Sequence, residues 1–268
     1  MGLSNIVVDI GGTKIKIGVI GNPLSVITLR TPQNGETCLN LIAQEALRLK
    51  DSETVIVVAC PGLITLAGVC ENALYVPLRG INIKEEIFKR TGCRTIVDND
   101  ANVQALGFCK PNSIYLSIGT GVGGAYINSK GAIERGQNNF SGEFGHLFVG
   151  GLDRCYCGRV GCLDTMAAGR VLVDKFGDKW WENDRTPEIT EKIIQAGEAS
   201  GRAIAQLSIL YDPQRIYIRG RICEFDAFKN AVMDAAARYG WYKAEIDFNV
   251  STWEGILAGS EKMISGIR

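Results

Sequence analysis

The sequence has a single histidine, no excess of charge of either sign and no long apolar run. Its 268 residues include 29 Lys and Arg against 29 Asp and Glu, so the formal net charge is zero. Because binding to nucleic-acid phosphates needs clustered basic side chains, this balance argues against a nucleic-acid-binding protein. The longest strongly apolar run, Val55–Cys60, falls well short of the about 20 residues that cross a membrane. We therefore expect no membrane span.

The N-terminus also lacks the pattern of a targeting signal. No cationic segment followed by an apolar one opens the chain, and Met1–Ile6 lacks the hydroxyl residue of a myristoylation signal. We therefore expect a cytoplasmic protein. At about 150 residues per domain, its length predicts one large or two modest domains, and 46% hydrophobic residues suffice for a core.

Cysteine is abundant and unevenly placed. The total of nine is odd, which makes a disulfide framework unlikely in a chain without an export signal. His146, Cys155, Cys157 and Cys162 fall within seventeen residues, and a Cys₃His set is typical of a closed, structural Zn²⁺ site. Reduced thiols or a redox pair are the alternatives. A zinc site would occupy the only histidine and so exclude Ser–His–Asp or Cys–His catalysis. The other six cysteines are expected in the core, at positions 38, 60, 70, 93, 109 and 223.

Two glycine-rich turns each follow an apolar strand and precede a second strand. The first contains Gly11, Gly12, Thr13 and Lys14, and the second contains Gly119, Thr120 and Gly121. Backbone N–H groups in such turns can bind a phosphate at close range, although either turn alone could be a plain hairpin. A dinucleotide-binding motif would open a helix instead, and no P-loop occurs. The long spacing between the two similar segments suggests a duplicated domain.

Carboxylates follow two of the predicted strands. Asp9 stands just before the first glycine turn, where it would serve Mg²⁺ or merely bond the turn backbone. Asp98–Asn102 holds four polar residues between a strand and a helix, more than a helix N-cap needs. For phosphoryl transfer to an alcohol, Asp100 fits the role of general base and Asn99 that of positioning amide.

Glu143 precedes His146 by three residues. On one helical turn the two side chains would share a face, so a zinc-bound loop would also fix the Glu143 carboxylate. A fixed carboxylate suits the binding of sugar hydroxyls, and the alternative is a solvated surface Glu.

Strands alternate with helices along the chain, which predicts an α/β fold with a largely parallel, helix-covered sheet. Beyond the two hairpins, strands are expected at 54–60, 95–97 and 215–218. Helices are expected at 36–50, 83–90, after 100, and at 163–176, 187–211, 225–239 and 254–264.

Taken together, these segments resemble the ROK family of sugar kinases and related repressors, in the actin-like ATPase superfamily. The matching segments, in the family's order, are 9–14, 61–62, 98–102, 119–124, 142–146 and 155–162. The resemblance implies two actin-like (ribonuclease H-like) domains with a nucleotide and sugar cleft between them. One would contain residues 1–110 and a returning C-terminal helix at about 254–268. The other would contain residues 111–253, with a zinc loop at 146–162.

The resemblance also implies roles for individual residues. ATP would be bound by the two glycine turns, including Lys14, and by Gly220, while Asp9 serves Mg²⁺. Asp100 would take a proton from a sugar hydroxyl, usually the 6-hydroxyl. The expected sugar-binding residues are Gly62, Asn99, Asp100, Glu143, His146 and Asp164, and a homodimer is expected.

Three departures from the family pattern affect specificity. Asp164 is one methylene shorter than the usual Glu, the adenine-side turn reads Arg219-Gly220-Arg221, and Gln137–Phe140 is bulkier and more polar than expected. The sequence predicts a kinase for a hexose or N-acetylhexosamine such as glucose, N-acetylmannosamine or N-acetylglucosamine. A non-catalytic sugar-binding or sugar-sensing protein is the alternative, and polyphosphate is an alternative donor. Because few residues precede Asp9 in the sequence, we expect no helix-turn-helix of the kind that the family's repressors carry before the first glycine turn.

Overall fold

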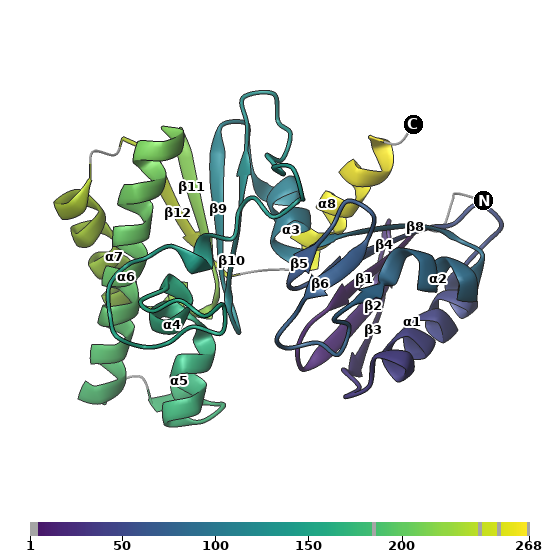
Figure 1. Cartoon of the computed structure of the whole chain (residues 1–268), viewed down its shortest axis with the longest axis horizontal. Coiled ribbons are helices and arrows are strands. Elements are labelled where there is room, and N and C mark those ends of the chain that lie inside the picture. Colours follow the sequence, from purple (N-terminus) through teal and green to yellow (C-terminus); the bar gives the residue numbers. More distant parts are fainter. Residues whose placement is uncertain (1–4, 184–185, 241–242, 251–252, 267–268) are drawn as a thin grey trace. The chain divides into compact units, whose positions relative to one another are not determined.

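The computed structural model describes residues 5–183, 186–240, 243–250 and 253–266. These residues form two compact units (Figure 1). Unit 1 comprises the described residues of 1–108, 135–141 and 252–268, and unit 2 comprises those of 109–134 and 142–251. The expectation about a targeting segment falls largely on residues 1–4, outside the described part of the chain. The domain boundaries and the cleft expected from the sequence stay predictions.

Unit 1 is built on a mixed sheet with the strand order β3-β2-β1-β4-β8. β1 is parallel to β4, and β4 to β8, whereas β1, β2 and β3 run antiparallel to their neighbours in sequence. The carboxyl ends of the three parallel strands therefore meet at one edge of the sheet, where Asp9 and Asp98–Asp100 lie. The strands are β1 (Ile6–Ile10), β2 (Lys14–Val19), β3 (Asn22–Arg30), β4 (Val55–Cys60) and β8 (Arg94–Asn99).

Helices cover both faces of this sheet, because its central strands are apolar on both sides. Ile6 and Val8 pack in the same cluster as residues of α1 and α2, whereas Val7 packs with Val103 of α3 and Ile256 of α8. The helices are α1 (Gly35–Leu49), α2 (Ile83–Thr91), α3 (Asp100–Phe108) and α8 (Trp253–Ser265). In this way the C-terminal helix belongs to unit 1.

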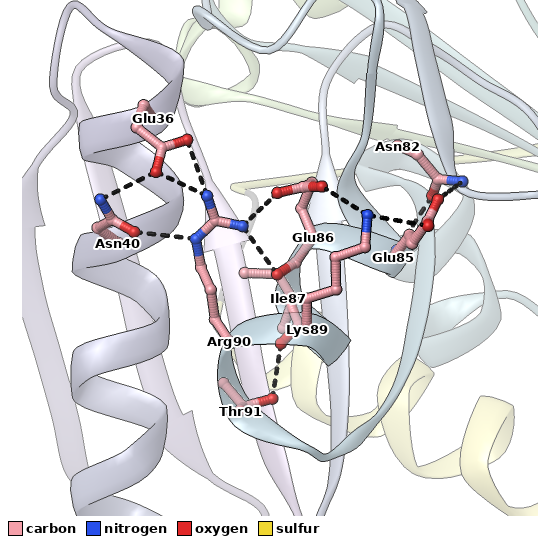
Figure 2. Close-up of polar contacts among 9 residues, drawn as sticks. All are labelled: Glu36, Asn40, Asn82, Glu85, Glu86, Ile87, Lys89, Arg90 and Thr91. Atoms are coloured by element: carbon pink, nitrogen blue, oxygen red, sulfur yellow. Dashed lines mark hydrogen bonds and ion pairs between the residues drawn. The ribbon is translucent and has the colours of Figure 1, made fainter.

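Polar side chains connect α1 to α2 on the surface of unit 1 (Figure 2). Arg90 of α2 donates to both carboxylate oxygens of Glu36 at 2.8 Å and to Asn40 Oδ1 at 2.9 Å. The same guanidinium also pairs with Glu86 one turn earlier in α2. α2 begins at the cap residue Asn82, whose side chain accepts from the Glu85 N–H at 3.1 Å.

The contact between α3 and α8 depends on glycine. A Cβ at Gly259 would lie 1.8 Å from the Val103 carbonyl oxygen, and one at Gly107 would lie 2.1 Å from the Gly255 oxygen. The two helix backbones can approach this closely only because those side chains are absent.

Unit 2 contains a second mixed sheet with the strand order β10-β9-β11-β12. Its strands are β9 (Ser113–Ile118), β10 (Val122–Ile127), β11 (Arg215–Arg219) and β12 (Glu245–Asn249). Apolar residues of β9 and β11 share one core with residues of α4, α6 and α7. The helices are α4 (Leu163–Ala167), α5 (Gly169–Phe176), α6 (Pro187–Tyr211) and α7 (Asp226–Tyr239), and 3₁₀ turns lie at Phe144–His146, Trp180–Asn183 and Arg221–Glu224.

The structure departs from the sequence prediction in three respects. The sheets are mixed, because each glycine hairpin adds an antiparallel strand to parallel ones. The helix expected at 163–176 is broken at the extended Ala168, because the Gly169 N–H donates to the Gly119 carbonyl at 2.7 Å. The sequence also missed β3, β12 and a separate small sheet of β5 (Leu63–Ile64), β6 (Val69–Asn72) and β7 (Ile81–Asn82).

No helix in the described part of the chain has the length and apolar character needed to cross a membrane.

Candidate functional site

The first glycine turn joins β1 to β2 in unit 1. Gly11 N–H donates to the Lys14 carbonyl at 2.9 Å, and the Gly11 carbonyl accepts from Thr31 Oγ1 at 2.6 Å. A Cβ at Gly12 would lie 2.9 Å from Cβ of Tyr75, a neighbour that sequence reasoning missed. Because the Gly11 N–H is used within the turn, a phosphate would have to be bound by the following N–H groups, those of Gly12 and Thr13.

Two carboxylates lie close together at the edge of the unit 1 sheet. Desolvation, reinforced by the Asp100 charge and opposed by Lys16, raises the pKa of Asp9 to about 6. Desolvation also raises the pKa of Asp100, against the effect of the Ala101 N–H, which donates to Asp100 Oδ1 at 2.9 Å. Both groups therefore hold a proton at higher pH than an ordinary aspartate and are suited to proton transfer or to cation binding.

Asn99 connects this edge to the segment after β4. Its Nδ2 donates to the Gly62 carbonyl at 3.0 Å, and its Oδ1 accepts from the N–H groups of Ala101 at 2.8 Å and Asn102 at 3.3 Å. The side chain therefore caps α3, as the N-cap alternative proposed, and also fixes Gly62 beside it. Asn99, Gly62, Asp100 and Asp9 are thus all at one end of the unit 1 sheet.

Asp98, which precedes Asn99 in β8, is buried, with 1% of its surface exposed. Its Oδ1 accepts from the Asn99 N–H at 2.8 Å, Asn102 Nδ2 at 2.9 Å and Asn139 Nδ2 at 3.3 Å. Its Oδ2 pairs with Arg135 Nη1 at 2.6 Å. The sequence predicts for Asp98 a role beyond that of a helix N-cap, but local spacing gives no signal for its partners Arg135 and Asn139, which come from a distant segment.

The second glycine turn joins β9 to β10 in unit 2. Gly119 N–H donates to the Gly121 carbonyl at 2.9 Å, and the Thr120 carbonyl accepts from the Arg170 N–H at 3.3 Å. A Cβ at Gly220 would lie 2.1 Å from the Ile118 carbonyl oxygen, so the adenine-side turn expected from the sequence approaches the end of β9 through a glycine.

The expected metal ligands come together in unit 2. The donor atoms of His146, Cys155, Cys157 and Cys162 all lie within 4.8 Å of one another. Cys155 Sγ is 3.5 Å from His146 Nδ1, and Cys157 Sγ is 3.6 Å from Cys162 Sγ. Tetrahedral zinc with ordinary bond lengths separates N from S by about 3.5 Å and two S atoms by about 3.8 Å. The four residues therefore fit Zn²⁺.

Ionisation of one thiol is also favoured. Although desolvation works against it, hydrogen bonds from Arg159 and the neighbouring thiols lower the pKa of Cys157 to about 7. A thiolate is the form in which cysteine binds a metal.

The other ring nitrogen of His146 has a partner within unit 2. His146 Nε2 lies 3.0 Å from the Tyr156 hydroxyl, and the two rings meet edge to face. Glu143 stands at the N-cap position of the 3₁₀ turn that ends at His146, whose N–H donates to the Glu143 carbonyl at 3.0 Å. Glu143 and His146 thus share one short turn, and Tyr156 is a neighbour that sequence reasoning missed.

The Asp164 carboxylate is bonded within unit 2 and does not face solvent. Its side chain is buried, with Oδ1 accepting from the Val122 N–H at 2.8 Å and Oδ2 paired with Arg170 Nη2 at 2.6 Å. Both oxygens therefore hold the second glycine turn and α5. Its direct contact with a sugar stays a prediction, and the geometry favours a positioning role.

The sequence profile of the ROK family matches residues 5–250. The chain belongs to the ROK family. It is 33% identical over 218 residues to a glucokinase of Streptomyces coelicolor, a match that covers 75% of this chain and 66% of that protein. It is 28% identical over 267 residues to a β-glucoside kinase of Listeria innocua, covering 87% of each chain. A ROK family glucokinase of Streptomyces griseus, solved with glucose and AMPPNP, superposes with a TM-score of 0.82 at 23% identity, covering 97% of this chain and 99% of that one. This last likeness concerns the fold.

The family membership confirms the resemblance seen in the sequence, and the relatives are named sugar kinases. The structure divides the expected site residues between the two units. Unit 1 contains Asp9, the first glycine turn, Gly62, Asn99 and Asp100, and unit 2 contains the second glycine turn, Gly220, Glu143, Asp164 and the Cys/His cluster.

Proposed function

We propose that this protein is an ATP- and Mg²⁺-dependent kinase that phosphorylates a hydroxyl, the 6-hydroxyl, of a hexose or N-acetylhexosamine. The observation that best supports the proposal is the pair of neighbouring carboxylates, Asp9 and Asp100, at the carboxyl edge of the unit 1 sheet, each with a raised pKa. The names of the relatives, glucokinase and β-glucoside kinase, support the same class of reaction.

Asp100 is the general base in this proposal. A sugar hydroxyl would donate its hydrogen bond to the Asp100 carboxylate, which would take the proton as the oxygen attacks the γ-phosphorus and the bond from that phosphorus to the β,γ-bridging oxygen breaks, releasing ADP. Desolvation raises the pKa of Asp100, which makes its carboxylate a stronger base than that of an ordinary aspartate. Asn99 and Gly62, bonded to each other beside it, would form the wall against which the reacting end of the sugar lies.

ATP with Mg²⁺ supplies the phosphoryl group. The N–H groups of Gly12, Thr13 and the second glycine turn would bind its phosphates, assisted by Lys14, and Gly220 would lie at the adenine side. Asp9 would hold Mg²⁺ directly or through water, and the cation would in turn relieve the repulsion between Asp9 and Asp100.

The remaining sugar hydroxyls would be bound from unit 2 by Glu143 and by His146 Nε2. Zinc would be structural, because protein atoms fill all four positions and no ligand site stays open for water. Its effect is to fix the turn that carries both residues. Asp164 would act through the Val122 N–H and Arg170 by holding the second glycine turn in place.

The test is ADP release from ATP and Mg²⁺ over a panel of glucose, N-acetylglucosamine, N-acetylmannosamine and β-glucosides. We expect turnover on at least one sugar, a fall in kcat of at least about 10²-fold in Asp100→Asn, and little change in sugar affinity. The exposed Asp178→Asn is the matched control and should retain activity. A fully active Asp100→Asn would overturn the proposal.

A non-catalytic sugar-binding or sugar-sensing protein is the second candidate. The observation that bears on it is Asp164, which stands where the family usually has Glu: its carboxylate bonds the Val122 N–H and Arg170, so this departure from the family pattern lies next to the proposed phosphate-binding turn. Saturable sugar binding without phosphorylation from ATP or polyphosphate would support it. Location in the cytoplasm and a homodimer belong to the kinase proposal as well, and size-exclusion chromatography with light scattering tests the dimer.

A further inference from the structure

A seven-residue segment, 135–141, leaves the chain of unit 2 and packs in unit 1. We call it the strap. Arg135 Nη1 pairs with Asp98 Oδ2 at 2.6 Å and also donates to Asn139 Oδ1 at 2.7 Å. Asn139 is 4% exposed, has a positive φ of 66°, and donates to the Ile64 carbonyl at 2.8 Å. Buried polar bonds therefore fix the strap at both the sheet edge and β5.

The strap forms one wall of a cavity of about 350 Å³ within unit 1, which we call the strap pocket. The opposite wall is the hairpin of β5 and β6. The pocket is lined by Thr65, Leu66, Ala67, Glu71, Gln137, Asn138 and Phe140. Within the part of the chain that the structure describes, no side-chain hydrogen bond or ion pair joins Glu71, Gln137 or Asn138 to another residue, and all three are exposed.

The lining has the composition of a site for a neutral, hydroxyl-rich ring. The two amides can donate to and accept from hydroxyl groups, and the Glu71 carboxylate can accept from them, while Phe140 and Leu66 offer apolar surface to the C–H groups of a ring. No Lys or Arg lines the pocket, and Glu71 would repel an anion, so a phosphate or carboxylate ligand is disfavoured.

The pocket starts close to the residues proposed for catalysis. Asn99 holds the Gly62 carbonyl, Asn139 holds the Ile64 carbonyl two residues later, and Thr65 follows in the pocket wall. Three residues of extended chain span at most about 11 Å. The Asn99 N–H and the Asn139 side chain both donate to the Asp98 carboxylate. The strap and the residues proposed for catalysis are therefore parts of one hydrogen-bonded network.

We propose that the strap pocket binds a neutral sugar ring other than the one that is phosphorylated. This ring is either the second ring of a glycoside substrate or a separate sugar molecule. The inference rests on the proposed function for its meaning in catalysis, but the binding itself does not require phosphoryl transfer. Binding of this second ring in the strap pocket would make Gln137 and Asn138 determinants of substrate class.

Isothermal titration calorimetry without nucleotide separates the two sources. If the ring belongs to the substrate, cellobiose binds at least tenfold more tightly than glucose, with one site per chain, and Gln137→Ala removes most of the difference. If it is a separate molecule, glucose binds at two sites per chain and Gln137→Ala abolishes one. Gln33→Ala, an exposed glutamine elsewhere in unit 1, is the matched control and should change neither result.

Kinetics distinguish failure of this inference from failure of the kinase proposal. With a second ring in the pocket, Gln137→Ala and Asn138→Ala raise KM for cellobiose about tenfold while KM and kcat for glucose stay unchanged. Equal affinity for both sugars, one site per chain and no effect of either variant would overturn the inference even if glucose is phosphorylated. If no sugar is phosphorylated but the expected calorimetric result is obtained, the kinase proposal fails while the proposed sugar binding in the strap pocket is supported.

Discussion

Asp9 shows at the residue scale how a site can cost stability. Its pKa of about 6 means that the folded protein binds a proton more tightly than the unfolded chain does. The side chain is therefore unfavourable in its ionised form at neutral pH, and that penalty disappears once it is protonated. A catalytic or cation-binding role gives such a residue a reason to be there.

We predict that Asp9→Asn stabilises the metal-free protein by about 1–3 kcal/mol at pH 8, because the shift from 3.8 to about 6 corresponds to at most about 3 kcal/mol. The folded-state pKa is raised, so the wild type is favoured below pH 4 and loses that stability as the pH rises through 6. Urea unfolding at pH 8 and pH 4 measures the difference, which should shrink at pH 4. The same variant should lack kinase activity, and Asp178→Asn should change neither property. A destabilised Asp9→Asn at pH 8 would contradict the prediction.

Tyr156 leads to a second prediction at this scale. With Nδ1 facing Cys155, His146 Nε2 is the nitrogen left to donate one hydrogen bond, and the Tyr156 hydroxyl stands 3.0 Å from it. A sugar hydroxyl that binds His146 must displace Tyr156. Removing a hydrogen bond of about 0.5–1.5 kcal/mol in Tyr156→Phe should lower the sugar KM by about 2–10-fold with kcat unchanged. A raised KM would mean instead that Tyr156 itself contacts the sugar. Steady-state kinetics decide between the two.

At the scale of elements, short segments hold in place some functional groups that the regular strands and helices do not hold. The second glycine turn is held by the N-terminus of α5 and by Asp164, and α5 is separated from α4 by the break at Ala168. A continuous helix would have directed the Gly169 N–H into the helix and left the Gly119 carbonyl without that partner. The helix prediction failed there because the bond comes from tertiary structure.

The Cys/His loop gives the prediction for this scale. Chelation of zinc, or Cys157→Ser, should reduce bound zinc from about one per chain to none, because each thiolate is one of four ligands. Loss of the ion should raise the sugar KM, with kcat/KM falling about 10–100-fold, since Glu143 and His146 lose their fixed turn. Metal analysis by mass spectrometry and kinetics on the same samples provide the measurement. Cys109→Ala, outside the cluster, should keep its zinc, and unchanged kinetics in a zinc-free protein would refute the structural role.

At the scale of the whole molecule, the proposed reaction would use residues of both units, and its pH dependence would report on the carboxylates of unit 1. Below pH about 6 Asp9 takes up a proton, and the raised pKa of Asp100 acts in the same direction. We expect kcat/KM for the sugar to fall as the pH decreases through this region. Added Mg²⁺ favours ionised Asp9 and should shift the fall to lower pH. A profile that stays flat to pH 4.5 at low Mg²⁺ would contradict this assignment of roles.

Much of the architecture followed from local patterns. The apolar, β-branched runs that became β1, β4 and β9 and the helices α1, α6 and α7 were predicted close to their observed bounds, because their periodicity and caps are local properties. The short strands β5 to β7 and the partly exposed β12 were missed, because strands this short or weakly patterned form only by pairing with neighbours.

The sequence by itself determined the family, the two glycine turns and the four residues of the Cys/His cluster, because each depends on residue type and spacing within a few positions. Only the tertiary structure decided the partners of Asp98, the commitment of both Asp164 oxygens, and the packing of the strap in unit 1. Apart from the pair of Asp164 and Arg170, which are six residues apart, these contacts join residues far apart in the chain through single hydrogen bonds or ion pairs, which leave no periodic pattern. For the same reason the strap pocket, with walls from residues 65–71 and 137–140, became visible only in the folded protein.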